Sequence, residues 1–462
     1  MTLPAVAEEL DLQELRVDVV EPHARGKRQW VRCEIGTDVQ FKLEGLKSYC
    51  LSPWQPVVYD AFLLAAAVQF CDHVKRRPRR GWARAIELRV PVHEPDRWND
   101  PAVTRVLHDV LNYLTGDRWA VSFKALRQTI DPPLQQPLAL ETDAAAIIPY
   151  SEGMDSRAVA GLMAREYGDK LIRVRLGSSG SGNRIKGGAR SPFAAVPYKL
   201  SRKKISFPET SARSRGFKFA VLSGMAAYLT GAAEIVVPES GQGALGPWLV
   251  PVGQAPADMR NHPLFMQKME TFLKALLGYQ VRFSFPRLWY TKGETLAAFA
   301  TGCPDGNSWA DTWSCWQGSR QVSVEGRKRQ CGICAACMLR RLAVHAAGLQ
   351  ERPNTYVWED LSVPDWNAGP AESFEHVTSA LYQYAIAGVL HLDHLAELNH
   401  SALSAQALNM KTAGLARATG LTKSEAEVRL RRLLEQHEKE WRSFVHAIGD
   451  DSFVTRWAKR AG

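Results

Sequence analysis

The residues Ile147-Ile148-Pro149-Tyr150-Ser151-Glu152-Gly153-Met154-Asp155-Ser156-Arg157 predict a buried strand, a turn of small residues and the start of a helix. Backbone N–H groups at such a turn, together with the positive end of the helix dipole, form a binding site for phosphate. The hydroxyls of Ser151 and Ser156 can add donors, and Asp155 can hold Mg²⁺ or orient the turn. An ordinary strand-to-helix turn with a Ser or Asp N-cap fits the same pattern, so both interpretations stay open here.

Strands and helices alternate around this turn. The predicted strands are Ala144–Pro149, Leu171–Leu176 and Glu234–Pro238, and the predicted helices are Ser156–Glu166 and about Ser214–Leu229. A Gly/Ser/Arg-rich loop over 177–189 follows the second strand. Apolar strands that alternate with helices indicate a parallel α/β sheet, in which ligands bind at the carboxyl ends of the strands.

The outer parts of the chain have other patterns. Residues 1–140 predict an α+β domain, with Arg16–Val20 and Gln29–Ile35 as a hairpin and a helix that opens at Ser52-Pro53. The segment Asp131–Pro137 follows neither the helix period nor the strand period, so it marks the first domain boundary. Residues 351–462 predict a helical region, where Thr422-x-x-Glu425 is a capping box. We therefore expect three domains: 1–140, 141–350 and 351–462.

Charge is concentrated in the middle of the chain. The net charge of +10 divides into −1 for residues 1–143, +14 for 144–350 and −3 for 351–462. An anionic partner is therefore expected at the middle segment. The composition is that of a folded protein, the longest strongly apolar run is Ala61–Val68, and the first ten residues lack the pattern of a secretory signal. These features predict a cytoplasmic protein without a membrane partner.

Four cysteines have the spacing of a metal site. They follow the pattern Cys315-x15-Cys331-x2-Cys334-x2-Cys337. Tetrahedral Zn²⁺ prefers four soft ligands in a closed shell, so we expect a structural zinc ion, with an iron–sulfur cluster as the alternative. A catalytic zinc is not expected, because no ligand position is left open. Cys303 is interpreted as a spare thiol.

The turn after Ile148 resembles the pyrophosphate loop, S-G-G-x-D-S, of the adenine-nucleotide alpha-hydrolase superfamily. Ser151, Gly153, Asp155 and Ser156 match this motif, and Glu152 stands where the motif has glycine. The resemblance implies a parallel-sheet (HUP-type) core that binds ATP and Mg²⁺, with those four residues at the nucleotide. Members of this superfamily adenylate a carboxylate or carbonyl of the substrate and release pyrophosphate.

Four motifs in order resemble QueC, the 7-cyano-7-deazaguanine synthase family. The pyrophosphate loop is followed by motifs similar to A-R-N-x-x-F, T-K-x-E, and T-W-S-C with C-G-x-C-x-x-C. These are Ala212–Phe217, Thr291–Glu294, Thr312–Cys315 and Cys331–Cys337. The resemblance covers roughly 144–350; Ser214 replaces the family's Asn, and Glu239–Gly243 lacks the family's tyrosine segment. The additional N- and C-terminal regions resemble the enlarged QueC-like proteins of anti-phage systems, namely QatC of the Qat system or the QueC-like protein of type IV CBASS.

The resemblance implies an ATP-dependent ligase that forms AMP and pyrophosphate. It would adenylate 7-carboxy-7-deazaguanine and pass the acyl group to an amine, either ammonia or an amine on a partner protein of the same defence operon. Arg213 is the best candidate for contacting phosphate or the adenylate, because it is the arginine of the A-R motif in a stretch rich in Lys and Arg. Lys292 is the second candidate. The catalytic set is then Asp155, Arg213 and Lys292.

Two other functions fit the same residues. A tRNA-modifying enzyme of the superfamily would use the basic middle segment, although few aromatic side chains are interleaved there and nucleic acid is not favoured. A zinc-stabilised scaffold without catalysis would tolerate Glu152 in the loop. Among the histidines, His262 could line the site, whereas His391, His394 and His437 are interpreted as packing or surface residues.

Overall fold

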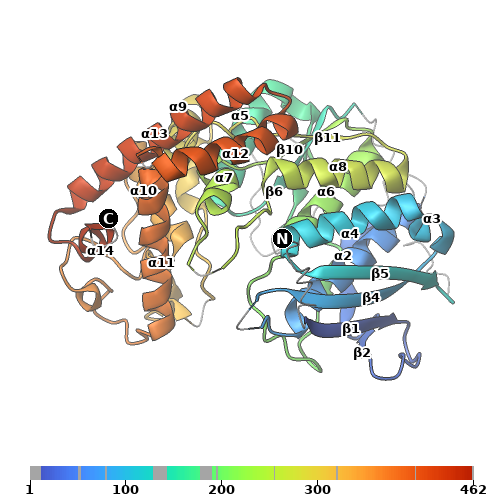
Figure 1. Ribbon diagram of the computed structural model, residues 1–462. Coiled ribbons are helices and arrows are strands. Elements are labelled where there is room, and N and C mark those ends of the chain that lie inside the picture. Colours follow the sequence, from blue (N-terminus) through green and yellow to red (C-terminus); the bar gives the residue numbers. More distant parts are fainter. Residues whose placement is uncertain are drawn as a thin grey trace, which may run out of the picture. The chain divides into compact units, whose positions relative to one another are not determined.

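The computed structural model describes residues 12–49, 54–78, 81–127, 143–176, 190–193, 196–253, 255–318, 321–400 and 402–459 (Figure 1). The chain forms two compact units. Unit 1 comprises residues 1–138, 197–225 and 271–279, and unit 2 comprises 139–196, 226–270 and 280–462. This division crosses the three expected domains, because two pieces of the middle segment belong to unit 1 and the whole C-terminal segment belongs to unit 2. The boundary expected at 131–137 lies outside the described residues.

Unit 1 contains a four-stranded sheet in the order β2-β1-β4-β5. The strands are β1 (Gln13–Val20), β2 (Val31–Glu34), β4 (Arg84–Val92) and β5 (Arg118–Ala125), and every adjacent pair is parallel. The predicted hairpin is therefore wrong, and so is the α+β class of this segment. The connection 21–30 is long enough to return the chain to the start of the neighbouring strand, and the Lys27 N–H fixes it by donating to Asp18 Oδ2 at 2.9 Å.

Helices separate the strands of unit 1. They are α1 (Leu43–Lys47), α2 (Pro56–Val74), α3 (Pro95–Asn99) and α4 (Pro101–Thr115), and β3 (Val39–Phe41) pairs antiparallel with β9 (Tyr198–Leu200). Among the described residues one helix, α2, is long and apolar enough to cross a membrane, but 83% of that stretch is buried. It packs on β4, as the core helix of a folded unit does. The predicted helix start at Ser52-Pro53 lies outside the described residues.

Unit 2 contains a five-stranded parallel sheet in the order β11-β10-β6-β7-β8. The strands are β6 (Ala146–Tyr150), β7 (Leu171–Arg175), β8 (Arg190–Phe193), β10 (Glu234–Val236) and β11 (Arg282–Ser284). The chain proceeds outward from β6 through β7 to β8, and then returns to the other side of β6 with β10 and β11. The strand order thus reverses between β6 and β10, which is where open α/β sheets bind ligands. The predicted parallel sheet is confirmed.

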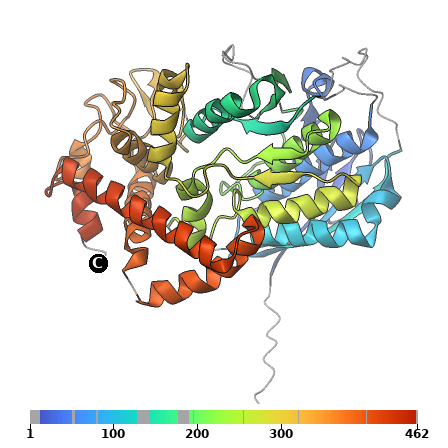
Figure 2. The ribbon, with the colours of Figure 1, turned by 90° about the horizontal axis from the view of Figure 1, so that it is seen from above.

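Helices make up most of the rest of unit 2. They are α5 (Met154–Tyr167), α7 (Gly241–Leu249), α9 (Lys292–Gly302), α10 (Ala335–Ala346), α11 (Ser379–Ala396), α12 (Ala402–Thr419), α13 (Lys423–Ile448) and α14 (Phe453–Lys459). The predicted capping box opens α13, with the Glu425 N–H donating to Thr422 Oγ1 at 3.2 Å. The long α13 packs against α12, α11 and α10 (Figure 2). Two helices, α6 (Arg215–Thr230) and α8 (Pro263–Leu277), contribute residues to both units.

Candidate active site and cysteine cluster

The turn after β6 is held by its own hydroxyl groups. The Ser151 N–H donates to Ser156 Oγ at 2.8 Å, and the Gly153 N–H donates to Ser151 Oγ at 3.3 Å. The Ser156 hydroxyl in turn donates to the Pro149 carbonyl at 3.4 Å. Gly153 is the N-cap of α5, so the helix begins directly at the turn. Strand, turn and helix therefore lie as the sequence predicts, and the turn is at the carboxyl end of β6 beside the reversal of strand order.

Glu152 is exposed although it stands at a glycine position of the resembled motif. Its carbonyl accepts the Trp313 N–H at 2.8 Å, so the backbone of the turn is joined to the Thr312–Cys315 segment. The side chain therefore projects to solvent, where a carboxylate keeps its hydration.

Asp155 forms a buried ion pair with Lys292. Asp155 is 6% exposed and Lys292 8%, and Lys292 Nζ contacts Asp155 Oδ2. Lys292 is the first residue of α9, and Asp155 lies in the first turn of α5. The two motifs that carry these residues are 137 positions apart in the chain. The structure thus brings together two of the three predicted catalytic residues.

A second carboxyl group, Glu239, joins this pair from the end of β10. Burial, and then the charge of Asp155, raise the pKa of Glu239 well above its ordinary value. Burial opposes ionisation of Asp155 too, but the Lys292 ammonium holds the pKa of Asp155 below its ordinary value. The Lys292 ammonium contacts Asp155 directly, which favours ionisation of Asp155 over that of Glu239. Asn261 Nδ2 donates to Glu239 Oε2 at 2.8 Å, which holds the second carboxyl group beside Asp155.

Asp155 also has an oxygen without a donor. Its Oδ1 is buried and receives no hydrogen bond from any N–H or hydroxyl group of the described residues. A buried acceptor without a donor is costly and is expected where a ligand or ion supplies the missing contact. A divalent cation prefers carboxylate oxygens, so Asp155 Oδ1 and Glu239 fit Mg²⁺ once the cation has displaced the proton of Glu239. Glu239 was not among the predicted site residues, although its position directly after a predicted strand was a signal for one.

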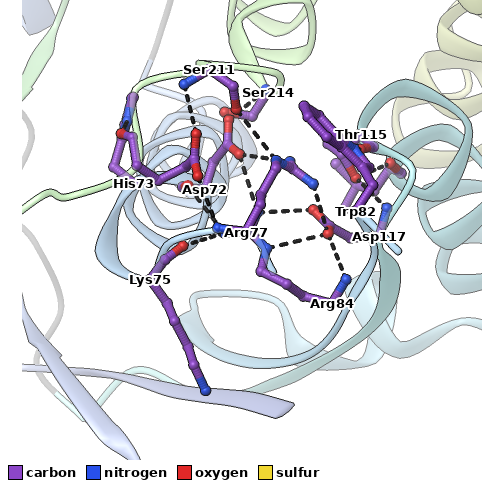
Figure 3. Close-up of polar contacts among 12 residues, drawn as sticks. Asp72, His73, Lys75, Arg77, Trp82, Arg84, Thr115, Asp117, Ser211 and Ser214 are labelled. Atoms are coloured by element: carbon purple, nitrogen blue, oxygen red, sulfur yellow. Dashed lines mark hydrogen bonds and ion pairs between the residues drawn. The ribbon is translucent and has the colours of Figure 1, made fainter. Parts of the chain in front are cut away.

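Arg213, the third predicted catalytic residue, belongs to unit 1. It is 6% exposed, and its guanidinium carbon lies 4.8 Å from the centre of the Trp82 ring. The backbone around it is constrained, because Ala212 has a φ of 48° and the Ser214 N–H donates to Asp72 Oδ2 at 2.8 Å (Figure 3). Asp155 and Lys292 belong to unit 2. The phosphate contact of Arg213 stays a prediction.

A network of buried charges in unit 1 supports the Arg213 segment (Figure 3). Arg84 pairs with Asp117 at 2.9 Å and with Asp72 at 3.2 Å, and Arg77 pairs with the same two acids at 2.9 and 3.0 Å. Burial alone would raise the pKa of Asp72, but the Arg77 guanidinium and the hydrogen bond from Ser214 hold it below its ordinary value. Asp72 lies in α2, Arg77 in the connection that follows it, Arg84 at the start of β4 and Asp117 directly before β5, and no sequence pattern indicated the network.

The four predicted cysteines converge in unit 2. Their Sγ atoms all lie within 4.8 Å of one another, and all four residues are buried. Cys331 Sγ and Cys337 Sγ are 3.7 Å apart, far beyond a disulfide bond and close to the about 3.8 Å edge of a tetrahedron with Zn–S bonds of 2.3 Å. Cys303 lies elsewhere, among the side chains of α5 and α9. The cluster therefore has the donor set and spacing to bind zinc.

Backbone and side chains around the cluster hold the sulfur atoms in place. The Cys331 N–H donates to Cys315 Sγ at 3.2 Å, and the Cys334 N–H donates to Cys331 Sγ at 3.3 Å. Buried Arg340 donates to Thr312 Oγ1 at 2.6 Å and pairs with Glu351 at 2.7 Å. Thr312 and Arg340 flank the cysteine motifs in sequence, and this contact gives them a structural role.

Part of this site lies in a segment that matches a known protein family. Residues 256–348 match the family described as Queuosine biosynthesis protein QueC. The matched part contains Lys292 and all four cysteines, whereas the turn at 151–156 and the segment 212–217 lie outside it. No curated protein matches the chain. The match supports a QueC-like, ATP-using protein, and the role of the turn at 151–156 stays a prediction.

Proposed function

We propose that the chain is an ATP-dependent enzyme that adenylates the carboxylate of 7-carboxy-7-deazaguanine. The observation that carries this proposal is the contact between Lys292 and Asp155. Lys292 lies in the part that matches QueC, and Asp155 lies in a turn of pyrophosphate-loop type outside it. The contact joins the matched motif to a phosphate-binding turn at the reversal of strand order, which favours nucleotide chemistry over a purely structural use of the zinc motif.

In the first step, a carboxylate oxygen of the substrate attacks the α-phosphorus of ATP. The bond from that phosphorus to the bridging oxygen breaks, and pyrophosphate leaves with the bonding electron pair. N–H groups at the start of α5 bind the leaving group, and the Lys292 ammonium offsets charge that develops on it. Asp155 keeps this ammonium in place. Asp155 Oδ1 and Glu239 would hold Mg²⁺, which supplies further positive charge to the phosphates.

In the second step, an amine attacks the acyl-adenylate and AMP leaves. Ammonia would give an amide, which a second ATP could convert to the nitrile, and an amine on a partner protein would give a conjugate. We assign the enzyme to anti-phage defence of the Qat or type IV CBASS kind, in the cytoplasm, because of the additional regions on either side of the QueC-like part. Zinc at the cysteine cluster has a structural role, since four thiolates close its coordination shell.

The test is formation of AMP and pyrophosphate from α-labelled ATP, Mg²⁺ and 7-carboxy-7-deazaguanine. Asp155→Asn removes the charge that holds Lys292, so we expect AMP formation to fall by about 100-fold or more. Glu166→Gln is the matched control, because Glu166 is exposed on the same helix, and it should keep the wild-type rate. No AMP from the wild-type protein, with ammonia and operon partners present, would exclude the proposed reaction.

A further inference from the structure

The last long helix, α13, contacts the start of α9 at three places. Arg432 pairs with Glu294, and its Nη1 lies 2.7 Å from Glu294 Oε2. Glu440 Oε1 accepts the Thr291 hydroxyl at 2.6 Å. His437 reaches the α9 backbone through a third residue, Gln242 of α7. All three α13 residues lie outside the part of the chain that matches QueC, yet all three act on the residues around Lys292.

The hydrogen bonds that join His437, Gln242 and Lys292 have defined donors and acceptors. His437 Nε2 faces the Leu392 carbonyl at 2.8 Å, so this nitrogen carries the proton. The other nitrogen, Nδ1, then accepts from Gln242 Nε2 at 2.7 Å, which leaves Gln242 Oε1 to accept the Lys292 N–H at 2.7 Å. This is the tautomer and amide orientation that satisfies every partner. Burial lowers the pKa of His437 to about 4, which keeps the ring neutral and the chain of hydrogen bonds intact.

The contact through Glu440 fixes the residue before Lys292. Thr291 Oγ1 accepts the Glu294 N–H at 3.1 Å in the capping box of α9, so its own proton is donated to Glu440. Both residues are buried, with Thr291 at 0% and Glu440 at 6% exposure. The backbones approach closely here, because a Cβ on Gly293 would lie 2.7 Å from the Ala346 Cβ and 3.3 Å from Glu440 Oε1. The first turn of α9 is therefore held on the side of α13.

We propose that α13 positions Lys292 against Asp155, with Arg432, His437 and Glu440 of α13 and the intervening Gln242 of α7 as the positioning residues. The Lys292 N–H and the preceding N-cap are both fixed by this helix, so the direction in which the buried side chain leaves the backbone is fixed as well. The C-terminal region then completes the site within unit 2. This inference rests on the proposed function for the role of Lys292, but not for its placement.

The test measures the reactivity of Lys292 in the full-length protein without ATP. Acetylation by N-hydroxysuccinimidyl acetate is followed at Lys292 by peptide mass spectrometry, with exposed Lys170 as the internal reference. Gln242→Met and Glu440→Met should raise the rate at Lys292 at least about 5-fold, because loosening the first turn of α9 opens the ion pair. Glu440→Gln keeps an acceptor for Thr291 and should restore the wild-type rate. Glu435→Met, at an exposed position of the same helix, should also behave as wild type.

Activity provides the second readout. Gln242→Met and Glu440→Met should lower kcat for AMP formation by about 10-fold or more with a smaller change in KM for ATP, since a misplaced ammonium loses transition-state contact. An unchanged acetylation rate at Lys292 in both Met variants would overturn the positioning role, whatever the activity. If the wild-type protein forms no AMP, the proposed function fails while the acetylation result still decides the positioning.

A further variant covers the case in which the buried Met variants do not fold. Zinc content and the melting temperature report folding. Arg432 is half exposed, so Arg432→Met removes the third contact without leaving a cavity. A raised acetylation rate at Lys292 in this variant supports the proposal, and an unchanged rate overturns it.

Discussion

Ionisable side chains are buried in different ways in the Arg77–Arg84 network of unit 1 and around the candidate site of unit 2. Unit 1 pairs opposite charges: Asp72 and Asp117 are each bound by both Arg77 and Arg84, and burial of Asp72 does not prevent its ionisation. Unit 2 mainly keeps its buried groups neutral. Burial lowers the pKa of His262 to about 3 and those of His391 and His437 to about 4, and it raises the pKa of Glu440 to about 7. In unit 2 the ion pair of Asp155 with Lys292 lies beside Glu239, a carboxyl group whose pKa is raised by burial.

The difference separates a structural network from a candidate site. In the unit 1 network, Asp72 and Asp117 are each paired with two guanidinium groups. In unit 2 two carboxyl groups share one ammonium, and Asp155 Oδ1 has no donor among the described residues. Sites that act on ligands retain such unmet contacts, whereas structural networks satisfy them.

The largest effect is expected from loss of the cysteine cluster in unit 2. Cys334→Ser removes one of four thiolates, so the protein should lose its zinc and on the order of 5 kcal/mol or more of stability. The cluster lies in a core that includes residues of α10, α11, α13 and α14, so this whole core should loosen. Metal analysis and thermal melting check this outcome. Cys303→Ser is the control. A zinc-free variant that melts like the wild type would contradict the structural role.

The next largest effect is the loss of stability expected when one of the buried ion pairs of unit 1 is broken. Arg84→Met leaves Asp72 and Asp117 with Arg77 alone, and breaking such a buried pair costs about 3–5 kcal/mol. Urea unfolding measures the loss. Arg89→Met is the matched control, because the Arg89 side chain is 35% exposed and its partner Asp18 also binds Lys124, so about 1 kcal/mol or less should be lost. Equal losses in the two variants would remove the distinction between a buried network and a surface pair.

The sequence predicted the features that depend on local spacing. The four cysteines follow a short ligand pattern, and the turn at Ser151–Ser156 is a continuous stretch, so both could be predicted from the sequence. Features that depend on long-range pairing were not found. The pairing direction of β1 and β2 is set by how the connection between them crosses the sheet, and alternation alone cannot show it. Glu239 and Gln242 become relevant only when β10 is placed beside β6.

The third effect concerns chemistry at the unit 2 pair. Lys292→Met removes the ammonium that would contact phosphate, so AMP formation should fall by about 100- to 1,000-fold, as for removal of one transition-state contact. The variant should still bind zinc, because the cysteine cluster lies elsewhere in the unit. Lys170→Met, at an exposed position, is the control. Wild-type AMP formation by Lys292→Met would place the chemistry at another group.

The fourth effect is a dependence of the free energy of unfolding on pH, which arises from the buried carboxyl group of Glu440 in unit 2. Burial, outweighing hydrogen bonds from Thr291 and Gln436, raises the folded pKa of Glu440 to about 7 from 4.5. Between these values the folded chain holds a proton that the unfolded chain has released, so stability falls as pH rises through this window. Glu440→Gln removes this contribution of about 1.4 kcal/mol per pH unit. The free energy of unfolding of the variant should therefore increase relative to that of the wild type as the pH rises from 5 to 7. Urea unfolding at several pH values measures this difference. Identical pH profiles of the two proteins would contradict the raised pKa of the buried Glu440 carboxyl group.

The smallest effect is expected at Glu152, where the unit 2 turn departs from the resembled motif. Glu152 is exposed, and it is not among the described residues with positive φ, so its backbone does not require glycine. An exposed carboxylate near a bound phosphate costs about 0.5–1 kcal/mol, so Glu152→Gly should lower KM for ATP by about 2- to 5-fold with no change in melting temperature. Glu152→Gln should do the same if charge is the cause. A much larger gain of activity in Glu152→Gly alone would mean that the natural turn does not turn over ATP efficiently, and it would favour the scaffold interpretation over the enzyme.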